Sequence, residues 1–138
     1  GLGADVPALD LAGAFDVVTM AAVIERLALF VTPDTGPMHL ATAVGTPVVA
    51  IHGPSDPARW GPRSGRARVV RVELPCSPCN RIRLPPERCR GRVPDCLAGV
   101  TVEAVTAAAI EQIDRFADRW RDAGAPPGAR TPGGTHVG

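Results

Sequence analysis

A strand, a tight loop and the start of a helix follow one another in Phe30-Val31-Thr32-Pro33-Asp34-Thr35-Gly36-Pro37-Met38-His39-Leu40. Residues 29–32 form a short apolar run that suits a buried strand. Pro37 suits the first turn of a helix, which we expect to continue through Val44 and to end at Gly45. In a parallel sheet such a loop lies at the carboxyl edge, where open α/β sheets bind ligands. The sequence therefore predicts an α/β fold with a ligand site at this loop.

The flanking sequence continues the alternation of helix and strand. We predict a helix capped by Asp16, buried strands over 47–51 and 69–74, an irregular segment over 58–68, and a long helix capped by Thr101. The expected apolar stripe of that last helix is Val102, Val105, Ala109, Ile113, Phe116 and Trp120. Buried strands that alternate with helices are typical of a parallel sheet. We expect a Rossmann-like domain over 1–121 that lacks an upstream part, followed by a disordered Gly/Pro-rich tail over 122–138.

The composition removes several classes of protein. The chain has 138 residues, a formal net charge of +1 and only 4% aromatic residues, so we expect no nucleic-acid partner. All of its basic residues are arginine, which rules out a lysine Schiff base or P-loop lysine. The sequence contains neither a transmembrane-length apolar run nor a signal-peptide pattern at its start, and we expect a cytoplasmic protein.

The loop after the first predicted strand has the chemistry of a phosphate site. A helix N-terminus presents unpaired N–H groups and partial positive charge. Gly36 allows phosphate to approach the backbone, and Thr35 adds a hydroxyl group. Met38 and His39 are candidate backbone donors, whereas Asp34 would repel phosphate and suits sugar hydroxyl groups. The alternative is an ordinary strand-to-helix turn in which Asp34 or Thr35 only caps the helix.

A second loop, His52-Gly53-Pro54-Ser55-Asp56-Pro57, follows the next predicted strand. If the two strands are neighbours, both loops meet at one sheet edge and form a cleft. For His52 itself, a structural or supporting role is the favoured interpretation.

Three motifs in fixed order resemble the heptosyltransferase family, glycosyltransferase family 9. They are Asp34-Thr35-Gly36-Pro37-Met38-His39-Leu40-Ala41, Gly45-Thr46-Pro47-Val48-Val49-Ala50 and Gly53-Pro54-Ser55-Asp56-Pro57. The likeness extends from about Leu11 to about Trp120 and includes Pro75-Cys76-Ser77-Pro78-Cys79. The resemblance implies the C-terminal half of a GT-B glycosyltransferase, in which two Rossmann-like domains flank a cleft.

What the resemblance implies for the site is specific. The donor would be an ADP-sugar, typically ADP-heptose, and transfer would proceed with inversion and without a catalytic cofactor. Asp34 would contact the donor sugar, while Thr35, Gly36 and the amides that follow, including that of Met38, would hold the diphosphate. His39 would lie near the phosphates and Phe15 near the adenine. The base expected in the family lies in an N-terminal domain, so no catalytic residue is assigned here and we expect this chain alone to be inactive.

Two other hypotheses stay open at this point. One is a sugar-nucleotide epimerase-like enzyme, whose fold shares a Gly-containing strand-to-helix loop but fits the Gly36-to-Leu40 run poorly. The other is a non-catalytic module that binds a nucleotide sugar or zinc. An α/β domain upstream in the gene would favour the transferase.

The four cysteines lie at Cys76, Cys79, Cys89 and Cys96. The C-x2-C pair suits a structural zinc site, although the second pair is spaced more loosely than in a typical zinc ribbon. Two disulfides or four reduced thiols are the alternatives, with disulfides the least favoured because cytosolic thiols stay reduced. We expect the four to gather as one cluster, since long loops without secondary structure need something to hold them.

Arginine is concentrated between Arg59 and Arg92, where ten arginines face only Glu73 and Glu87. A solvated loop is the simplest explanation. The functional alternative is attraction to an anionic glycolipid acceptor, as the resemblance implies, or to the inner face of the cytoplasmic membrane.

Overall fold

A computed structural model describes residues 7–81, 89 and 93–118 of the chain. Its elements in order are α1 (Val17–Glu25), β1 (Phe30–Pro33), α2 (Gly36–Ala43), β2 (Val48–Ile51), α3 (Pro57–Trp60), β3 (Ala67–Val70), α4 (Asp95–Ala98) and α5 (Val102–Arg115). The predicted tail over 122–138 and Trp120 lie outside the described residues.

The three strands form one parallel sheet in the order β1-β2-β3. Phe30 is paired with Val48 and Val48 with Ala67, so the strands start level and end level. The segments that follow the three strands therefore all begin at one edge of the sheet, at Asp34, His52 and Arg71. This confirms the predicted parallel α/β fold and the meeting of the first two loops.

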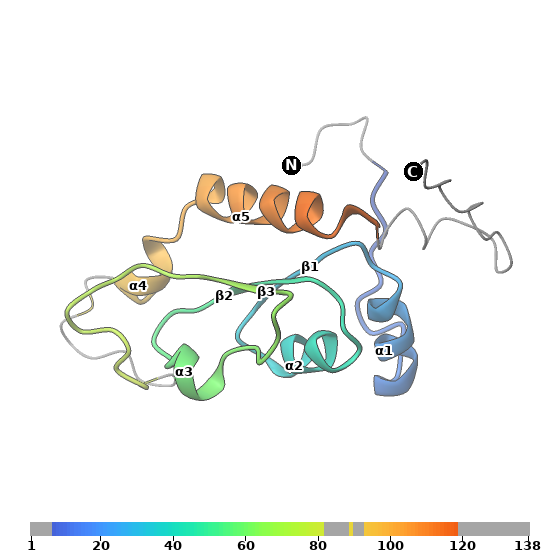
Figure 1. The fold of residues 1–138 in the computed structure, drawn as a ribbon. Coiled ribbons are helices and arrows are strands. Elements are labelled where there is room, and N and C mark those ends of the chain that lie inside the picture. Colours follow the sequence, from blue (N-terminus) through green and yellow to red (C-terminus); the bar gives the residue numbers. More distant parts are fainter. Residues whose placement is uncertain (1–6, 82–88, 90–92, 119–138) are drawn as a thin grey trace, which may run out of the picture.

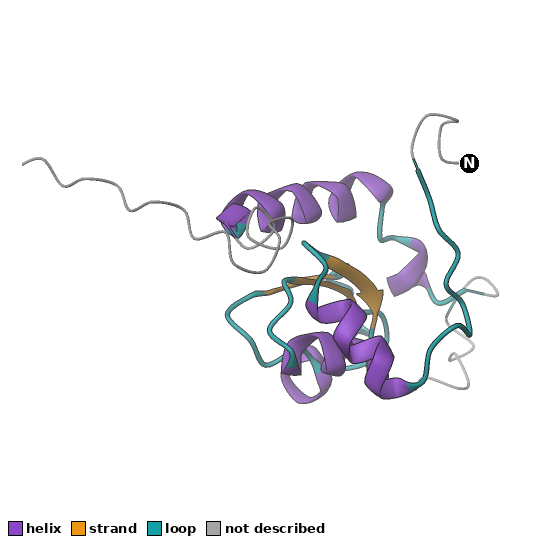
Figure 2. Cartoon of the chain, turned by 90° about the vertical axis from the view of Figure 1, so that its right-hand side faces the viewer, coloured by secondary structure: helices purple, strands orange, loops and turns teal. Residues whose placement is uncertain are grey.

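Helices cover both faces of the sheet. Figure 1 shows α5 on one side and α2 on the other, with α1 beside α2, and Figure 2 shows the strands between these layers. The core on the α2 side contains Ile24, Met38, Ala41, Val48 and Ala50, all buried. Val49 is also buried, and because side chains alternate along a strand it faces the α5 side.

Local signals in the sequence account for the helix ends. The Asp16 carboxylate accepts a hydrogen bond from the Thr19 amide at 2.8 Å, and the Thr101 hydroxyl accepts one from Ala104 at 3.2 Å. Gly45 has a φ of +75° just after α2, the left-handed conformation that terminates helices and that glycine adopts without strain. Both predicted N-caps and the predicted C-terminal glycine are confirmed.

Three details of the sequence prediction were wrong. The segment predicted to be irregular over 58–68 holds most of α3 and the start of β3. Asp56 caps α3 by accepting from the Ala58 amide at 2.9 Å. β3 ends at Val70 and not at residue 74, and the short helix α4 lies inside the predicted cysteine loop.

The buried face of α5 also differs from the predicted stripe. Ala108 and Gln112 are buried, whereas Val102 is 77% exposed. The helix packs against β2 and β3. Ala108 has no side-chain atom beyond Cβ, so the helix can approach the sheet closely along this face. The apolar residues Val102, Ile110 and Ile113 are left exposed.

Candidate functional site

The first two loops at the carboxyl edge are joined by backbone and side-chain contacts. The Asp34 amide donates to the Ile51 carbonyl oxygen at 3.1 Å, which continues the pairing of β1 with β2. Beyond it, an Asp34 carboxylate oxygen lies 3.9 Å from Nδ1 of His52. The His52 ring is fully buried, whereas the Asp34 side chain is 20% exposed. The carboxylate therefore lies beside a buried ring and remains partly accessible to solvent.

His52 is in turn positioned by its own loop. Its Nδ1 lies 3.3 Å from the Ser55 hydroxyl, and Ser55 is buried. Burial lowers the pKa of His52, and the positive charge of Arg71 and the nearby His39 lower it further, while Asp34 acts in the opposite direction. A lowered pKa favours the neutral imidazole, so the ring lies beside Asp34 without neutralising the charge of its carboxylate.

The phosphate-site interpretation of the Asp34 loop gains support from the way α2 begins. Thr35 occupies the N-cap position, but its side chain makes no capping hydrogen bond. Its hydroxyl donates to the Pro33 carbonyl oxygen at 3.3 Å and lies 3.4 Å from the Thr32 hydroxyl. The first amides of a helix lack partners within the helix. Pro37 has no N–H and the Met38 amide donates to the Thr35 carbonyl oxygen at 3.1 Å, so the Gly36 amide is the one that the Thr35 side chain leaves uncapped for an anion.

Gly36 opens α2 beside free space. A Cβ atom added at Gly36 would meet no heavy atom of the described chain within 4 Å, and its φ lies outside the left-handed region. Neither packing nor backbone conformation within the described residues therefore requires glycine here. Close approach of a ligand to the backbone is a reason that does.

The other predicted donor residues lie on or near this helix in different surroundings. Met38 is fully buried in the core, and its amide already donates to the Thr35 carbonyl oxygen at 3.1 Å. His39 is exposed in the first turn of α2. Phe15 is 38% exposed immediately before the Asp16 cap. Met38 thus shapes the loop from beneath, while the His39 side chain is available at the surface.

Sequence reasoning missed Arg71 at this edge. It follows β3 directly and its side chain is only 18% exposed. Its Nε lies 3.1 Å from a Glu73 carboxylate oxygen, and it also donates to the Ser77 carbonyl oxygen at 3.4 Å. The predicted strand over 69–74 placed Arg71 in mid-strand. With the strand end at residue 70, its place after a third parallel strand would have identified it.

Several arginines of the basic segment have structural partners. Arg66 donates to the Gly45 carbonyl oxygen at 3.2 Å, and Arg68 lies 3.8 Å from the Glu111 carboxylate. Arg59 stacks over the ring of Trp60 at 5.0 Å. Arg83, Arg88, Arg90 and Arg92 lie outside the described residues. Part of the local charge is therefore used to pack the segment onto the domain.

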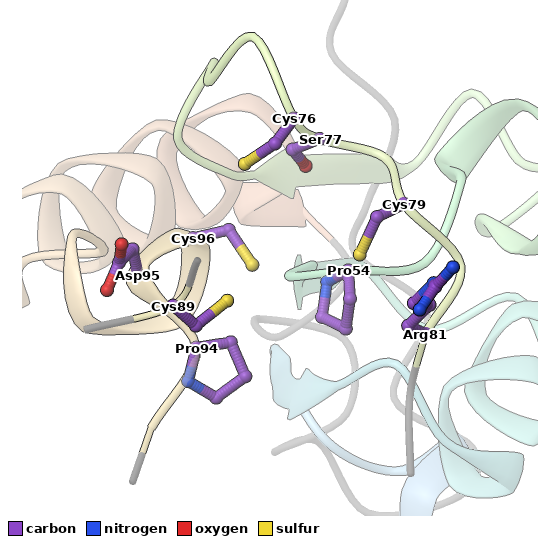
Figure 3. A pocket seen from close by; sticks show the side chains of 9 residues that line it. All are labelled: Pro54, Cys76, Ser77, Cys79, Arg81, Cys89, Pro94, Asp95 and Cys96. Atoms are coloured by element: carbon purple, nitrogen blue, oxygen red, sulfur yellow. The ribbon is translucent and has the colours of Figure 1, made fainter. Parts of the chain in front are cut away.

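The four cysteines line one small pocket, as expected. Figure 3 shows Cys79, Cys89 and Cys96 turned toward one another, with Cys76 beside Cys96. All four are free thiols in the structure. Burial raises the pKa of the Cys96 thiol, and the three other cysteines raise it further.

Comparison with known proteins shows which family the chain belongs to. Residues 3–88 match the family described as glycosyltransferase family 9 (heptosyltransferase). This match spans more than half of the chain. The chain belongs to glycosyltransferase family 9. The epimerase hypothesis is therefore not favoured.

Individual relatives of the chain are consistent with its membership of glycosyltransferase family 9. The chain is 35% identical over 63 residues to a lipopolysaccharide core heptosyltransferase (OpsX) of Haemophilus influenzae, covering 46% of this chain and 18% of that protein. It is 40% identical over 63 residues to lipopolysaccharide heptosyltransferase 2 of Escherichia coli, with the same coverage. The solved structure of E. coli ADP-heptose LPS heptosyltransferase II matches with a TM-score of 0.60 and 27% identity, over 76% of this chain and 27% of that one. The chain thus corresponds to a minor part of these relatives.

No helix among the described residues of this family 9 chain is long and apolar enough to cross a membrane.

Proposed function

We propose that this chain is the donor-binding part of a glycosyltransferase that uses an ADP-sugar, with heptose as the sugar. One observation carries the proposal: Gly36 opens α2 beside free space, at the carboxyl edge of a parallel sheet. Diphosphate oxygens bind well where helix amides and the positive end of the helix dipole converge. The names of the relatives, all heptosyltransferases, supply the choice of sugar.

The roles of the residues follow from their surroundings. The Gly36 amide and the positive end of the α2 dipole, with the Thr35 hydroxyl, would hold the diphosphate and stabilise the charge that develops on it as the sugar departs. Asp34, partly accessible to solvent and beside His52, would accept hydrogen bonds from sugar hydroxyl groups. The exposed His39 would add a donor near the phosphates. Phe15 would contact the adenine.

The rest of the reaction is proposed from the family resemblance. The acceptor would be an anionic glycolipid of the lipopolysaccharide-core type, and transfer would invert the anomeric carbon in a GT-B arrangement. A base outside this chain would deprotonate the acceptor hydroxyl group. The reaction would take place in the cytoplasm, and the arginines of the basic segment would favour approach of the acceptor at the membrane surface.

Amide chemical shifts recorded during a titration with ADP test the donor site. We expect weak binding with the largest shifts at Thr35, Gly36 and His39, and smaller ones in the His52 loop. Gly65, a solvent-exposed glycine before β3, serves as the internal control and should not move. Shifts confined to α5 or to the C-terminal residues would contradict the proposal.

A further inference from the structure

The cysteine cluster is built from parts of the chain that are distant in sequence. Cys76 and Cys79 lie in the segment after β3, whereas Cys96 lies in α4. Together with Cys89 they line a cavity of about 10 Å³, which is close to the space that one water-sized sphere fills. A space of that size, surrounded by sulfur, suits a single ion better than an organic ligand.

The chemistry of the lining favours a soft cation. Four thiolates are a complete tetrahedral ligand set for zinc, and no other protein ligand set binds it with softer donors. Binding would release the thiol protons. Arg81 and Asp95, whose side chains carry opposite charges, also line the pocket (Figure 3).

The sulfurs would have to close on the ion. Among the residues that the structure describes, no group of three or more His, Cys, Asp or Glu side chains has the geometry of a finished metal site. Cysteine needs only rotation about χ1 to re-aim its sulfur. Two of the four, Cys76 and Cys79, lie three residues apart in one segment, so binding requires the two sides of the pocket to adjust and not the whole fold.

The cluster is coupled to the second loop of the donor edge. The Asn80 amide donates to the Pro54 carbonyl oxygen at 2.8 Å, and the Asn80 side chain accepts from the Asp56 amide at 3.1 Å. The Ser77 hydroxyl donates to the Gly53 carbonyl oxygen at 3.2 Å.

Helix α4, on the other side of the pocket, packs against the same His52 loop. A Cβ atom at Gly53 would lie 2.5 Å from Cγ of Leu97 in α4, so α4 packs directly on the loop backbone. An ion that joins the Cys76–Cys79 segment to α4 would hold the His52 loop in place between them.

We propose that Cys76, Cys79, Cys89 and Cys96 bind one zinc ion as a structural tetrathiolate site that fixes the segment between β3 and α5 against the His52 loop. The site is distinct from the proposed donor site and does not depend on the sugar donor.

Metal analysis of the whole chain tests the proposal. The protein is expressed without a polyhistidine tag, purified under reducing conditions without chelator, and measured by mass spectrometry of its elements. We expect about one zinc per chain in the wild type. Cys79→Ser and Cys96→Ser should each lose most of it, whereas Ser77→Ala, which alters the same pocket without removing a sulfur, should retain it.

A cobalt titration guards against variants that fail to fold. Reduced, metal-free wild-type chain should take up one Co²⁺ with the absorption bands of tetrahedral thiolate cobalt, and Zn²⁺ should displace it. One equivalent of iron in place of zinc would contradict the assignment of zinc to the site.

Three results would overturn the site. The first is less than about a tenth of an equivalent of any transition metal together with four freely titratable thiols. The second is cobalt spectra of octahedral oxygen or nitrogen ligation. The third is metal content that is unchanged in folded Cys79→Ser and Cys96→Ser variants.

Discussion

The Asp34 loop and the cysteine segment lie at the same end of the sheet but are held in different ways. The Asp34 loop spans only the gap between β1 and α2, and its conformation follows from the strand and helix that it joins. The segment from Arg71 to Pro94 is much longer, and none of the residues that the structure describes within it belongs to a helix or strand. Short connections between regular elements inherit their order, whereas long ones need contacts of their own.

This difference suggests separate roles for the two regions, with ligand binding at the Asp34 loop and structural support from the cysteine segment. The Asp34 loop offers open backbone and an accessible carboxylate, which are features for a ligand. The cysteine segment has clustered thiols and hydrogen bonds to the neighbouring His52 loop, which are features that hold that loop in place. Perturbing the two regions separately should therefore give different results.

Metal removal should have the largest effect, and it should be local. With a chelator present, the Asn80 and Asp56 amides should exchange with solvent at least tenfold faster, because their hydrogen bonds depend on the clamped loop. The Val48 amide, which donates to the Arg66 carbonyl oxygen at 2.9 Å within the sheet, is the control and should be unaffected. An equal increase in the exchange rate of all three amides would show that the cluster supports the whole domain and not the His52 loop in particular.

Asp34→Asn should weaken binding of the sugar and leave the nucleotide contact intact. Hydrogen bonds to a charged group contribute about 1.5–3 kcal/mol, so ADP-heptose affinity should fall about tenfold or more while ADP affinity stays the same or rises. Asp56→Asn, in the neighbouring loop, is the matched control. If the affinities for ADP and ADP-heptose fell equally in Asp34→Asn, the assigned role of Asp34 would be wrong.

His52 should make stability depend on pH. Its pKa is lowered in the folded state, mainly by burial, so the unfolded chain takes up a proton near pH 6.5 while the folded chain does not. The free energy of unfolding should then be highest above about pH 6.5 and decrease as the pH falls toward 5, by at most about 1.4 kcal/mol per pH unit. Denaturant unfolding at several pH values measures this slope.

The exposed His39 offers the comparison for that experiment. His52→Gln should flatten the slope between pH 6.5 and 5, whereas His39→Gln should leave most of it. The reverse result would show that the buried ring is not the group that titrates.

The smallest effect is expected at the N-cap of α5. Thr101→Ala removes the hydroxyl that accepts from Ala104 and should lower the free energy of unfolding by about 1 kcal/mol. Thr106→Ala, at an exposed position within the same helix, should change it by less than about 0.5 kcal/mol. A loss of equal size in the two variants would mean that the cap bond does not contribute.

Sequence was sufficient where the determinants are local. Asp16, Thr101 and Gly45 each mark a helix end through a bond or conformation that involves only nearby residues, and all three were predicted. The strand-loop-helix arrangement around Asp34 was predicted for the same reason, because its signals lie within a few residues of one another.

Sequence was insufficient where tertiary packing decides. The buried face of α5 is set by close approach at Ala108 and not by its largest apolar residues. The end of β3 is set by its pairing with β2, which stops at Ile51, and so Arg71 was not placed at the edge. The role of Ser77 and Asn80 in pinning the His52 loop depends on contacts across 24 residues of sequence, which no local pattern reveals.

The central claim is that a nucleotide diphosphate binds at the start of α2, and calorimetric titration of ADP into two glycine variants tests it most directly. A Cβ atom at Gly36 or at Gly65 meets nothing within 4 Å of the described chain, so Gly36→Val and Gly65→Val should both fold as the wild type does. Gly36→Val should lose at least tenfold in ADP affinity, about 1.4 kcal/mol, because its side chain fills the space where phosphate approaches the backbone. Gly65→Val should bind ADP as the wild type does. Wild-type affinity in a folded Gly36→Val variant would contradict the claim.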